Sequence, residues 1–333
     1  MKDLTVIMYH YVREIKSSRY PGIKGLEINL FREQVKFLKK NYNPVTMQMV
    51  IDAFNDGEHL PPKSCLLTFD DAYIDHYVNV FPILYENNIQ GCFYAPVRAV
   101  TEHKVLDVNK IHFILEQCHD LRDNHQSIIE ELKNCLDEFR SEYNLHSFDY
   151  YYDKLAIANR FDTKEVVFIK RLLQVELDET LRGLLTDRLF KKYVLRSEVD
   201  EDTFSRELYM SVDQMRTMVK CGMHVGSHGY NHYWLGHLSD EKQDFEISKS
   251  VDFLRSIGAD VGNWTICYPY GNYNEYTLEV LKANGCKLGF TTEVNIADSA
   301  ARHDAIYKLP RLDTNDLPKE ACAKVNEWWG KTI

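Results

Sequence analysis

Hydrophobic and polar positions follow two different periods along the chain, and these periods predict strands and helices in alternation. Short apolar runs typical of buried strands occur at residues 4–9 (LTVIMY), 65–69 (CLLTF) and 91–97 (GCFYAPV). Helical spacing occupies the intervals, as in FREQVKFLKKNY from residue 31 and DHYVNVFPILYENN from residue 75. Strands that alternate with helices indicate βαβ units with parallel strands.

The same alternation returns after residue 208. Helical spacing is found in SVDQMRTMVKCG, DEKQDFEISKSVDFLRSIG and NEYTLEVLKANG, and the segments MHVGSH, NWTICYPYG and CKLGFTTE have the character of strands. The predicted helix ends carry suitable residues. Ser211 and Ser239 are predicted N-caps, and three glycines stand where C-terminal caps belong: Gly222, Gly258 and Gly285.

The segment from residue 101 to residue 208 has a different composition. It contains no proline, and its first glycine is Gly183. Leu, Glu, Lys and Arg recur in it at helical spacing, as in IIEELKNCLDEF. We therefore predict an α/β domain formed by residues 1–100 and 209–333, with residues 101–208 as a helical insertion.

Composition and charge narrow the classes of function. The chain has 333 residues, of which 44% are hydrophobic, and a formal net charge of −10. The negative charge argues against nucleic acid or an anionic bilayer as the main partner. We expect no transmembrane segment, because no stretch approaches about 18 uncharged apolar residues, and the first apolar run is too short for a signal peptide. Eight cysteines without a CxxC pair indicate reduced, mostly buried thiols, so we expect a cytoplasmic protein.

Two motifs at predicted strand ends suggest chemistry. Asp70 and Asp71 follow CLLTF, where the backbone can turn both side chains towards one pocket. Two such carboxylates repel each other unless a cation keeps one ionised while the other handles a proton. His228 and His232, in GSHGYNH, can bind one cation together with a carboxylate from elsewhere, and this set leaves positions for water and substrate. Either motif alone is more often a turn, a cap or part of a core.

Four motifs together resemble a known family: TFDD, SHGYNH, CYPYG and the LPR of residues 309–311. Over roughly residues 1–100 and 210–315 the chain resembles the NodB-homology polysaccharide deacetylases, carbohydrate esterase family 4. The resemblance implies a distorted (β/α) barrel of the α/β class, a divalent metal ion, with Zn²⁺ as the expected ion, and removal of acetyl groups from N-acetylated sugars. The YH in VIMYHYV resembles the N-terminal segment of the poly-N-acetylglucosamine deacetylase branch, in which the order of motifs is permuted.

The resemblance also implies roles for individual residues. It makes Asp70 the general base for the attacking water, and Asp71, His228 and His232 the metal ligands. The backbone N–H of Tyr270, in the YPYG turn, becomes a donor to the oxyanion that forms on the acetyl group.

A leaving amine also needs a general acid. The C-terminal LxLH-type motif that supplies this histidine in many members is not found here. By resemblance to the permuted branch we assign the role to His10, with His303 as the reserve candidate. A structural role for His10 at the end of its strand remains the alternative.

The sequence departs from the family pattern at two places. Gly229 stands where Ser or Thr usually follows the first histidine ligand, so the supporting hydrogen bond of the loop must come from elsewhere, with Ser227 as the candidate. Cys267 stands where many members have the arginine that orients the base. Our hypothesis is that Arg311 supplies this positive charge, and the alternative is an arginine on the surface.

We expect the substrate to be an N-acetylated sugar in a glycan or glycan precursor of surface-polysaccharide biosynthesis. Two forms stay open: a sugar nucleotide in the cytoplasm, or a lipid-linked glycan intermediate at the inner membrane face. Sugars stack on aromatic faces. The aromatic candidates that flank the proposed ligands are Tyr73, Tyr230, Tyr233, Trp234 and Tyr273. The insertion is open to three interpretations: a lid, a layer against the side of the barrel, or a surface for a homo-oligomer.

Other functions stay open on the sequence. An amidase of a cyclic amide or ureide, as in the allantoinase-like branch, would be a hydrolase of another substrate class, and the full metal set argues only against its metal-independent form. A non-catalytic carbohydrate-binding protein would keep the aromatic residues but would not need Asp70 and His10. A nucleotide-sugar oxidoreductase would require a GxGxxG motif near the first strand, and the sequence has none there.

Overall fold

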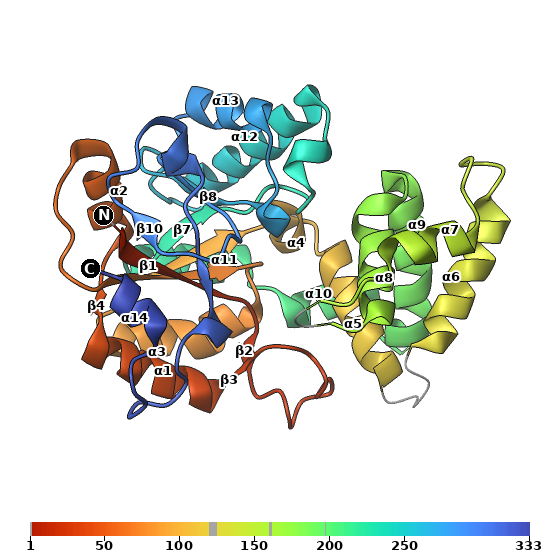
Figure 1. The fold of residues 1–333 in the computed structure, drawn as a ribbon, viewed down its shortest axis with the longest axis horizontal. Coiled ribbons are helices and arrows are strands. Elements are labelled where there is room, and N and C mark those ends of the chain that lie inside the picture. Colours follow the sequence, from red (N-terminus) through yellow and green to blue (C-terminus); the bar gives the residue numbers. More distant parts are fainter. Residues whose placement is uncertain (1, 120–124, 160–161, 197) are drawn as a thin grey trace. The chain divides into compact units, whose positions relative to one another are not determined.

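The computed structural model describes residues 2–119, 125–159, 162–196 and 198–333 (Figure 1). Parts of the predicted insertion, residues 120–124, 160–161 and 197, therefore lie outside the described residues. The chain forms two compact units. The first comprises Met1–Glu14, Gly25–Lys104 and Ser205–Ile333, and the second comprises Ile15–Lys24 and Val105–Phe204. The second unit thus also includes a segment near the N-terminus that the sequence pattern did not single out.

A sheet of nine strands forms the centre of the first unit. Its consecutive members β1, β5, β6, β7, β8 and β9 all pair in parallel. These strands span Lys2–Tyr9, Ser64–Asp70, Gly91–Ala95, His224–Ser227, Thr265–Cys267 and Leu288–Phe290. Short strands β4 (Asn43–Pro44), β10 (Ala297–Asp298) and β11 (Leu312–Asp313) complete the sheet, and β2 (Val12–Arg13) pairs with β3 (Leu26–Glu27) in a separate one.

The sheet curls because one segment connects its two edges. Leu309 pairs with Phe290 of β9, and β11 pairs in parallel with β1 through Ile7 and Leu312. Arg311 therefore lies between the two strands that this segment joins. The arrangement is the curled sheet of a distorted (β/α) barrel, as the resemblance implied.

The strands are buried on both faces, as is typical of parallel sheets covered by helices. Every residue of β5 is buried. Leu67 and Phe69 belong to the larger core cluster, together with residues of the surrounding helices, whereas Leu66 belongs to a second cluster with Tyr94. Because side chains alternate along a strand, Thr68 and Asp70 lie on the same face as Leu66.

The helices of the first unit begin and end close to the predicted positions. Ser211 forms a capping box with Gln214, and the backbone after three helices is left-handed at Gly222, Gly258 and Gly285, with φ of 83°, 79° and 74°. These features confirm the caps predicted at Ser211 and at the three glycines. Ser239 stands at the predicted N-cap position, before Asp240, but its side chain forms no capping hydrogen bond. The helices are α1 (Ile28–Asn41), α2 (Met47–Asp56), the π-helical turn η1 (His76–Val80), α3 (Phe81–Glu86), α4 (Val97–Thr101), α11 (Val212–Lys220), α12 (Asp240–Ser256), α13 (Glu275–Ala283) and α14 (Glu327–Lys331).

Helices also dominate residues 105–208. They are α5 (Asp107–His119), α6 (Gln126–Phe139), α7 (Phe148–Leu155), α8 (Lys164–Arg171), α9 (Glu179–Phe190) and α10 (Glu201–Leu208), with π-helical turns at Leu172–Glu176 and Lys191–Leu195. Within the described part of the chain, no helix is long and apolar enough to cross a bilayer. Seven cysteines carry free thiols, five of them buried, and the side chain of Cys118 lies outside the described residues.

Candidate active site

The end of β5 turns two neighbouring carboxylates towards one place. Asp70 is the last residue of the strand, and Asp71 and Ala72 then adopt left-handed backbone conformations with φ of 76° and 54°. The carbonyl of Ala72 accepts a hydrogen bond from the N–H of Met210 at 2.9 Å, which holds this turn. A regular strand would send Asp70 and Asp71 to opposite faces, so the turn is what allows both to serve one site.

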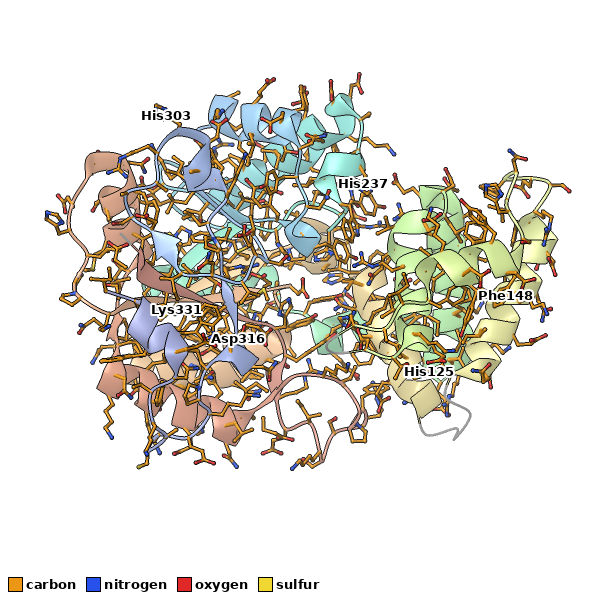
Figure 2. The ribbon with its side chains drawn as sticks, viewed as in Figure 1. His125, Phe148, His237, His303, Asp316 and Lys331 are labelled. Carbon is orange, nitrogen blue, oxygen red and sulfur yellow. The ribbon has the colours of Figure 1, made fainter. Side chains whose placement is uncertain are left out.

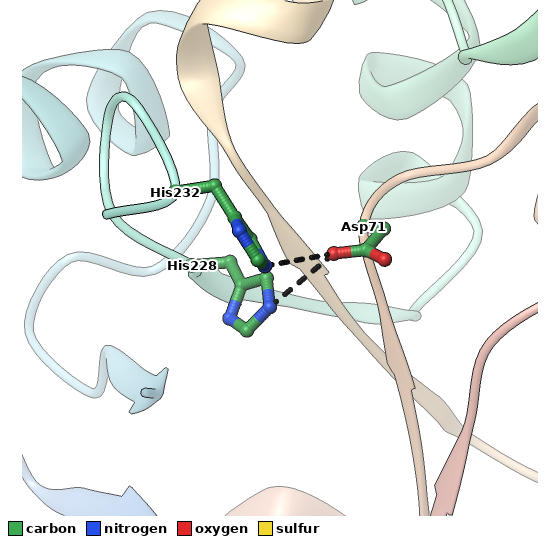
Figure 3. A group of neighbouring side chains, drawn as sticks. All are labelled: Asp71, His228 and His232. Carbon is green, nitrogen blue, oxygen red and sulfur yellow. Dashed lines mark ion pairs between the residues drawn. The ribbon is translucent and has the colours of Figure 1, made fainter. Parts of the chain in front are cut away.

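The predicted metal ligands lie together in the structure (Figure 3). Oδ1 of Asp71 is 3.4 Å from Nε2 of His228 and 3.3 Å from Nε2 of His232. All three residues are buried, and their candidate ligand atoms lie within 4.8 Å of one another. The two histidines belong to the loop after β7, so they converge from a tight loop and not from a helical turn.

Asp71 and His228 are oriented by hydrogen bonds to their remaining polar atoms, whereas Nδ1 of His232 has no hydrogen-bond partner among the described residues. The hydroxyl of Tyr73 donates a 2.6 Å hydrogen bond to Oδ2 of Asp71. Nδ1 of His228 lies 2.6 Å from the carbonyl oxygen of Cys267, which can only accept, so Nδ1 carries the proton and Nε2 of the neutral ring keeps its lone pair. Burial opposes ionisation of Asp71, but when the two imidazoles carry a proton on Nε2, His228 and His232 hold the pKa of Asp71 well below its usual range.

Oδ1 of Asp71 is a buried acceptor with no hydrogen-bond partner among the described residues. It faces two imidazole nitrogens that can each offer a lone pair, and a buried polar atom in this position is costly unless something satisfies it. One carboxylate oxygen and two imidazole nitrogens are a donor set suited to Zn²⁺ and related divalent ions. The residues therefore fit the expected cation.

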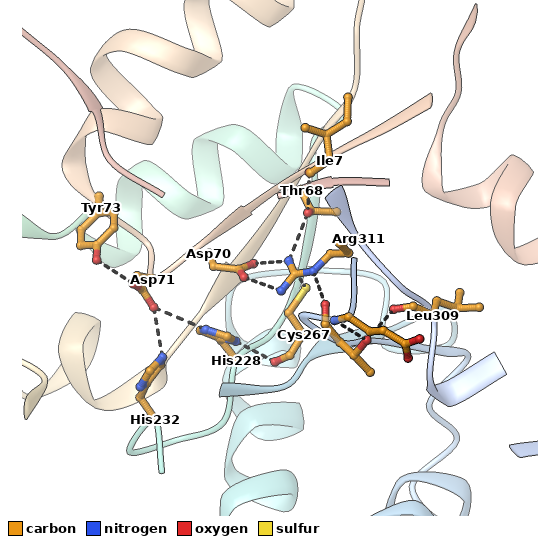
Figure 4. A network of polar contacts seen from close by, with 12 residues as sticks. Ile7, Thr68, Asp70, Asp71, Tyr73, His228, His232, Cys267, Leu309 and Arg311 are labelled. Carbon is orange, nitrogen blue, oxygen red and sulfur yellow. Dashed lines mark hydrogen bonds and ion pairs between the residues drawn. The ribbon is translucent and has the colours of Figure 1, made fainter. Parts of the chain in front are cut away.

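Arg311 binds the second carboxylate with both ends of its guanidinium group (Figure 4). Nη1 donates to Oδ1 of Asp70 at 2.9 Å, and Nη2 lies 2.7 Å from Oδ2. Arg311 also donates to Thr68 at 3.2 Å, to the sulfur of Cys267 at 3.1 Å and to the carbonyl of Thr291 at 2.9 Å. Burial opposes ionisation of Asp70, but Arg311 outweighs it and lowers the pKa to about 2, with a smaller contribution from the charge of nearby histidines.

The structure places Arg311 in the interior and not on the surface. Its guanidinium touches Cys267, the residue at which the sequence departs from the family pattern, so a positive charge reaches Asp70 from the segment just before β11. This contact pairs Asp70 and holds its carboxylate in one orientation.

His10 follows β1, and its half-buried side chain is close enough to lower the pKa of both Asp70 and Asp71 by its charge. Its backbone is held from the neighbouring turn η1. Nε2 of the buried His76 donates to the carbonyl of His10 at 2.9 Å, and Asp75 accepts a hydrogen bond from the N–H of Val12 at 3.1 Å. Burial lowers the pKa of His76 to about 4, so this ring is neutral at ordinary pH.

The reserve candidate His303 lies elsewhere. It is exposed and follows β10, which pairs with the N-terminal part of β1, whereas the site lies at the carboxyl ends of the strands. Its neighbour Asp304 forms an ion pair with Lys282 of α13 at 2.5 Å, and Figure 2 shows His303 at the outer edge of the first unit. The structure thus brings His10, but not His303, to the carboxylates.

The turn Pro269–Gly271 carries Tyr270 in a left-handed conformation with φ of 58°. The ring of Tyr270 lies 4.8 Å from that of His232 and stacks on that of Trp234 at 4.7 Å, measured between centroids. His237 also stacks on Trp234, at 5.6 Å between centroids, so the indole belongs to a group of stacked rings that reaches His232 through Tyr270.

Tyr73 was a wrong choice as a sugar-stacking residue. It is buried, it stacks on Tyr11 at 4.0 Å between centroids, and its hydroxyl holds Asp71. Sequence proximity to the carboxylates was a correct indication that Tyr73 is near the site. Which way the ring points depends on the turn after β5, and the sequence did not reveal that turn.

Sequence reasoning also missed Glu246. Ser227 does accept the predicted hydrogen bond, from the N–H of Gly229 at 3.2 Å, but the carboxylate of Glu246 binds the same loop through three further hydrogen bonds. Glu246 is buried on α12 beside Ile247 and Ser250. A charged residue within the buried face of an amphipathic helix was the available signal.

Comparison with known proteins relates this geometry to a family. The model of the polysaccharide deacetylase family matches residues 190–289. A protein of Bacillus subtilis (strain 168) named "Putative polysaccharide deacetylase YxkH" is 27% identical over 126 residues, which are 37% of this chain and 44% of that protein. The poly-beta-1,6-N-acetyl-D-glucosamine N-deacetylase of Escherichia coli (strain K12) is 38% identical over 80 residues, 23% of this chain and 12% of that protein. The matches therefore span less than half the length of either relative.

The fold has a solved counterpart. The Streptococcus pyogenes deacetylase PplD, determined in complex with acetate, superimposes with a TM-score of 0.56 and 18% sequence identity, over 93% of this chain and 91% of that one. At this identity the likeness concerns the fold alone. The match of the family model, with which the names of the two relatives agree, identifies a polysaccharide deacetylase domain of the NodB-homology type at residues 190–289.

Proposed function

We propose that this protein is a metal-dependent hydrolase that removes the acetyl group from an N-acetylated sugar in a glycan or glycan precursor. The observation that carries the proposal is the convergence of Asp71, His228 and His232 on one point, next to a second carboxylate that Arg311 keeps ionised. The relative from Escherichia coli, whose name states that it de-acetylates poly-β-1,6-N-acetylglucosamine, supports an N-acetylated glycan as substrate. A role in surface-polysaccharide biosynthesis is part of the same proposal.

Oδ1 of Asp71 and the Nε2 atoms of His228 and His232 would hold the cation. A bound divalent cation supplies Lewis-acid chemistry: it polarises the acetyl carbonyl and makes water a stronger nucleophile near neutral pH. Asp70 would take the proton of the attacking water. Its oxygens each accept one contact from Arg311, and a carboxylate has further lone pairs available for that proton.

The amine must leave as a protonated group, and His10 is the residue we assign to this step. It stands at the end of β1, next to β5 in the sheet, and the contacts from His76 and Asp75 hold its backbone in place. The backbone N–H of Tyr270 is assigned to the oxyanion by resemblance, and its position beside His232 is compatible with this role.

The test is release of acetate from a panel of substrates, coupled to metal analysis. Purified protein loaded with Zn²⁺ would be incubated with N-acetylated sugar nucleotides, oligomers of β-1,6-N-acetylglucosamine and a cyclic ureide. We expect acetate from an N-acetylated sugar, and a loss of about 10²–10⁴-fold in Asp70→Asn with its metal content unchanged. Ring opening of the ureide without acetate would favour the amidase, and a protein without metal would contradict the proposal. Cell fractionation tests the expected cytoplasmic location.

A further inference from the structure

The loop that carries both histidine ligands is held by a buried carboxylate from another element. Glu246 lies on α12, and only 1% of its surface is exposed. One oxygen, Oε2, accepts hydrogen bonds from the N–H of Tyr230 at 2.6 Å and of Asn231 at 2.9 Å. The other oxygen, Oε1, accepts from the side-chain amide of Asn231 at 2.6 Å. A carboxylate can accept several hydrogen bonds at once, which suits it to this position.

The opposite side of the loop is held by the first turn of α4. The N–H of Val97 donates to the carbonyl of Gly229 at 3.2 Å, and the N–H of Arg98 donates to the carbonyl of Tyr230 at 3.0 Å. The loop between the ligands is therefore clamped from both sides by backbone-directed hydrogen bonds. The contacts from α4 come from its backbone N–H groups and from Nη1 of Arg98, which lies 3.4 Å from Oδ1 of Asn231, whereas the contacts from α12 all end on the one carboxylate of Glu246.

Gly229 makes this contact sterically feasible. Its φ is 73°, and a Cβ atom at this position would lie 3.0 Å from Oε2 of Glu246. The glycine that interrupts the family pattern thus leaves room for the carboxylate against the backbone. Gly229 and Glu246, which stands 17 positions later on α12, are therefore neighbours in the structure.

We propose that Glu246 is a positioning residue that aims the imidazoles of His228 and His232 at the cation, an inference that rests on the proposed metal site. The ligands stand at the two ends of the clamped loop, so a shift of its backbone moves at least one Nε2 atom away from Oδ1 of Asp71. Groups outside the ligand set that orient the ligands commonly change metal affinity by about 10–100-fold when they are removed.

The test compares Glu246→Ala and Glu246→Gln with a matched control on the same helix. Gln243 is also fully buried on α12, but its side chain donates to the carbonyl of Leu238 and accepts from Thr277, so Gln243→Ala removes buried hydrogen bonds without touching the loop. Affinity for Zn²⁺ would be measured by competition with a chelator on the folded full-length protein. The electronic absorption spectrum of the Co²⁺-loaded protein reports the coordination geometry independently of activity.

We expect Glu246→Ala to weaken Zn²⁺ binding by about 10–100-fold and to shift the Co²⁺ bands, while Gln243→Ala leaves both unchanged. Glu246→Gln keeps one acceptor oxygen for the two backbone N–H groups but brings its amide against that of Asn231. Glu246→Gln should therefore lose less affinity for Zn²⁺ than Glu246→Ala. It is the decisive variant if Glu246→Ala does not fold.

Two results would overturn the inference while leaving the proposed function intact. One is wild-type affinity and an unchanged Co²⁺ spectrum in the Glu246 variants, and the other is an equal loss of affinity in Gln243→Ala. A wild-type protein that binds no Zn²⁺ would overturn the proposed function together with this inference. Loss of binding in Asp71→Ala would establish that the measured ion occupies the site.

Discussion

Asp70 and Asp71 are neighbours in the sequence, yet their surroundings differ. Arg311 binds both oxygens of Asp70, whereas Asp71 offers one oxygen to Tyr73 and directs the other towards His228 and His232. The guanidinium group of Arg311 thus neutralises Asp70, whereas Asp71 remains available for an exchangeable metal ion. Two like charges can be buried side by side because each carboxylate has a positive partner of its own.

At the scale of single residues, the first prediction concerns Arg311. Arg311→Ala should lower the free energy of unfolding by about 3–5 kcal/mol, because it leaves Asp70 buried as an uncompensated charge. Chemical denaturation would measure the loss. Adding Asp70→Asn to Arg311→Ala should recover part of it, since the unpaired charge is then gone. Strictly additive losses in the double variant would contradict the coupling of the two side chains.

A second prediction separates the two candidates for the general acid. His10→Ala should reduce turnover by about 10²–10⁴-fold while the content of bound metal stays unchanged, because an acid contributes to the reaction and not to the ligand set. His303→Ala is the matched control, and it should have full activity because His303 is exposed away from the strand ends. Equal losses in both variants, or a loss only in His303→Ala, would reverse the assignment.

At the scale of the elements, the site depends on close packing of β7 against its neighbours. Gly226 of β7 has no room for a side chain, because a Cβ atom would lie 2.7 Å from the carbonyl oxygen of Thr265 on β8. The strand then ends at Ser227, one residue before the first ligand. A displacement of β7 is therefore transmitted directly to His228.

The third prediction compares Gly226, which has no room for a side chain, with Gly183, which has open space around it. Gly226→Ala should destabilise the protein by about 1–3 kcal/mol, as is usual when a methyl group is forced into a well-packed interior. Gly183→Ala, in α9, should stabilise it by about 0.5–1 kcal/mol, since nothing lies within 4 Å of the added carbon and alanine favours the helix. The free energy of unfolding in denaturant measures both. A stabilising Gly226→Ala would contradict the described packing of β7 on β8.

At the scale of the whole molecule, the candidate metal site brings together parts of the chain that are far apart in sequence. Asp71 comes from the N-terminal part of the first unit, and His228 and His232 come from the part that follows the helical segment. A ligand that binds only the folded state stabilises it in proportion to its concentration above the dissociation constant.

The fourth prediction follows from this coupling between metal binding and folding. Zn²⁺ at 100 times its dissociation constant should raise the free energy of unfolding by about 2.7 kcal/mol. The effect should vanish in Asp71→Ala and after addition of a chelator. Thermal denaturation with and without Zn²⁺ measures it, and the same stabilisation in Asp71→Ala would place the ion somewhere else.

The sequence by itself determined much of the local structure. The apolar runs and helical spacings located the strands of the parallel sheet and its helices, because the burial of a strand or helix face imposes a period on the chain. Motifs at strand ends pointed to Asp70, Asp71, His228 and His232 as one group, because parallel strands bring their carboxyl ends to the same edge. These inferences need only short-range patterns and one topological rule.

Only the tertiary structure decided which distant side chains complete the site. Arg311 reaches Asp70 across 241 positions in the sequence, and Glu246 reaches the histidine loop from the middle of a helix. The LPR motif suggested Arg311 but left a surface position open, and no period or motif pointed to the contact of Glu246. Both contacts depend on how the sheet curls and how the helices pack on it. The left-handed turn after Asp70 is of the same kind, since it includes Ala72, and alanine seldom adopts this conformation. Packing imposes this turn, and with it the direction of the carboxylate that faces the two imidazoles.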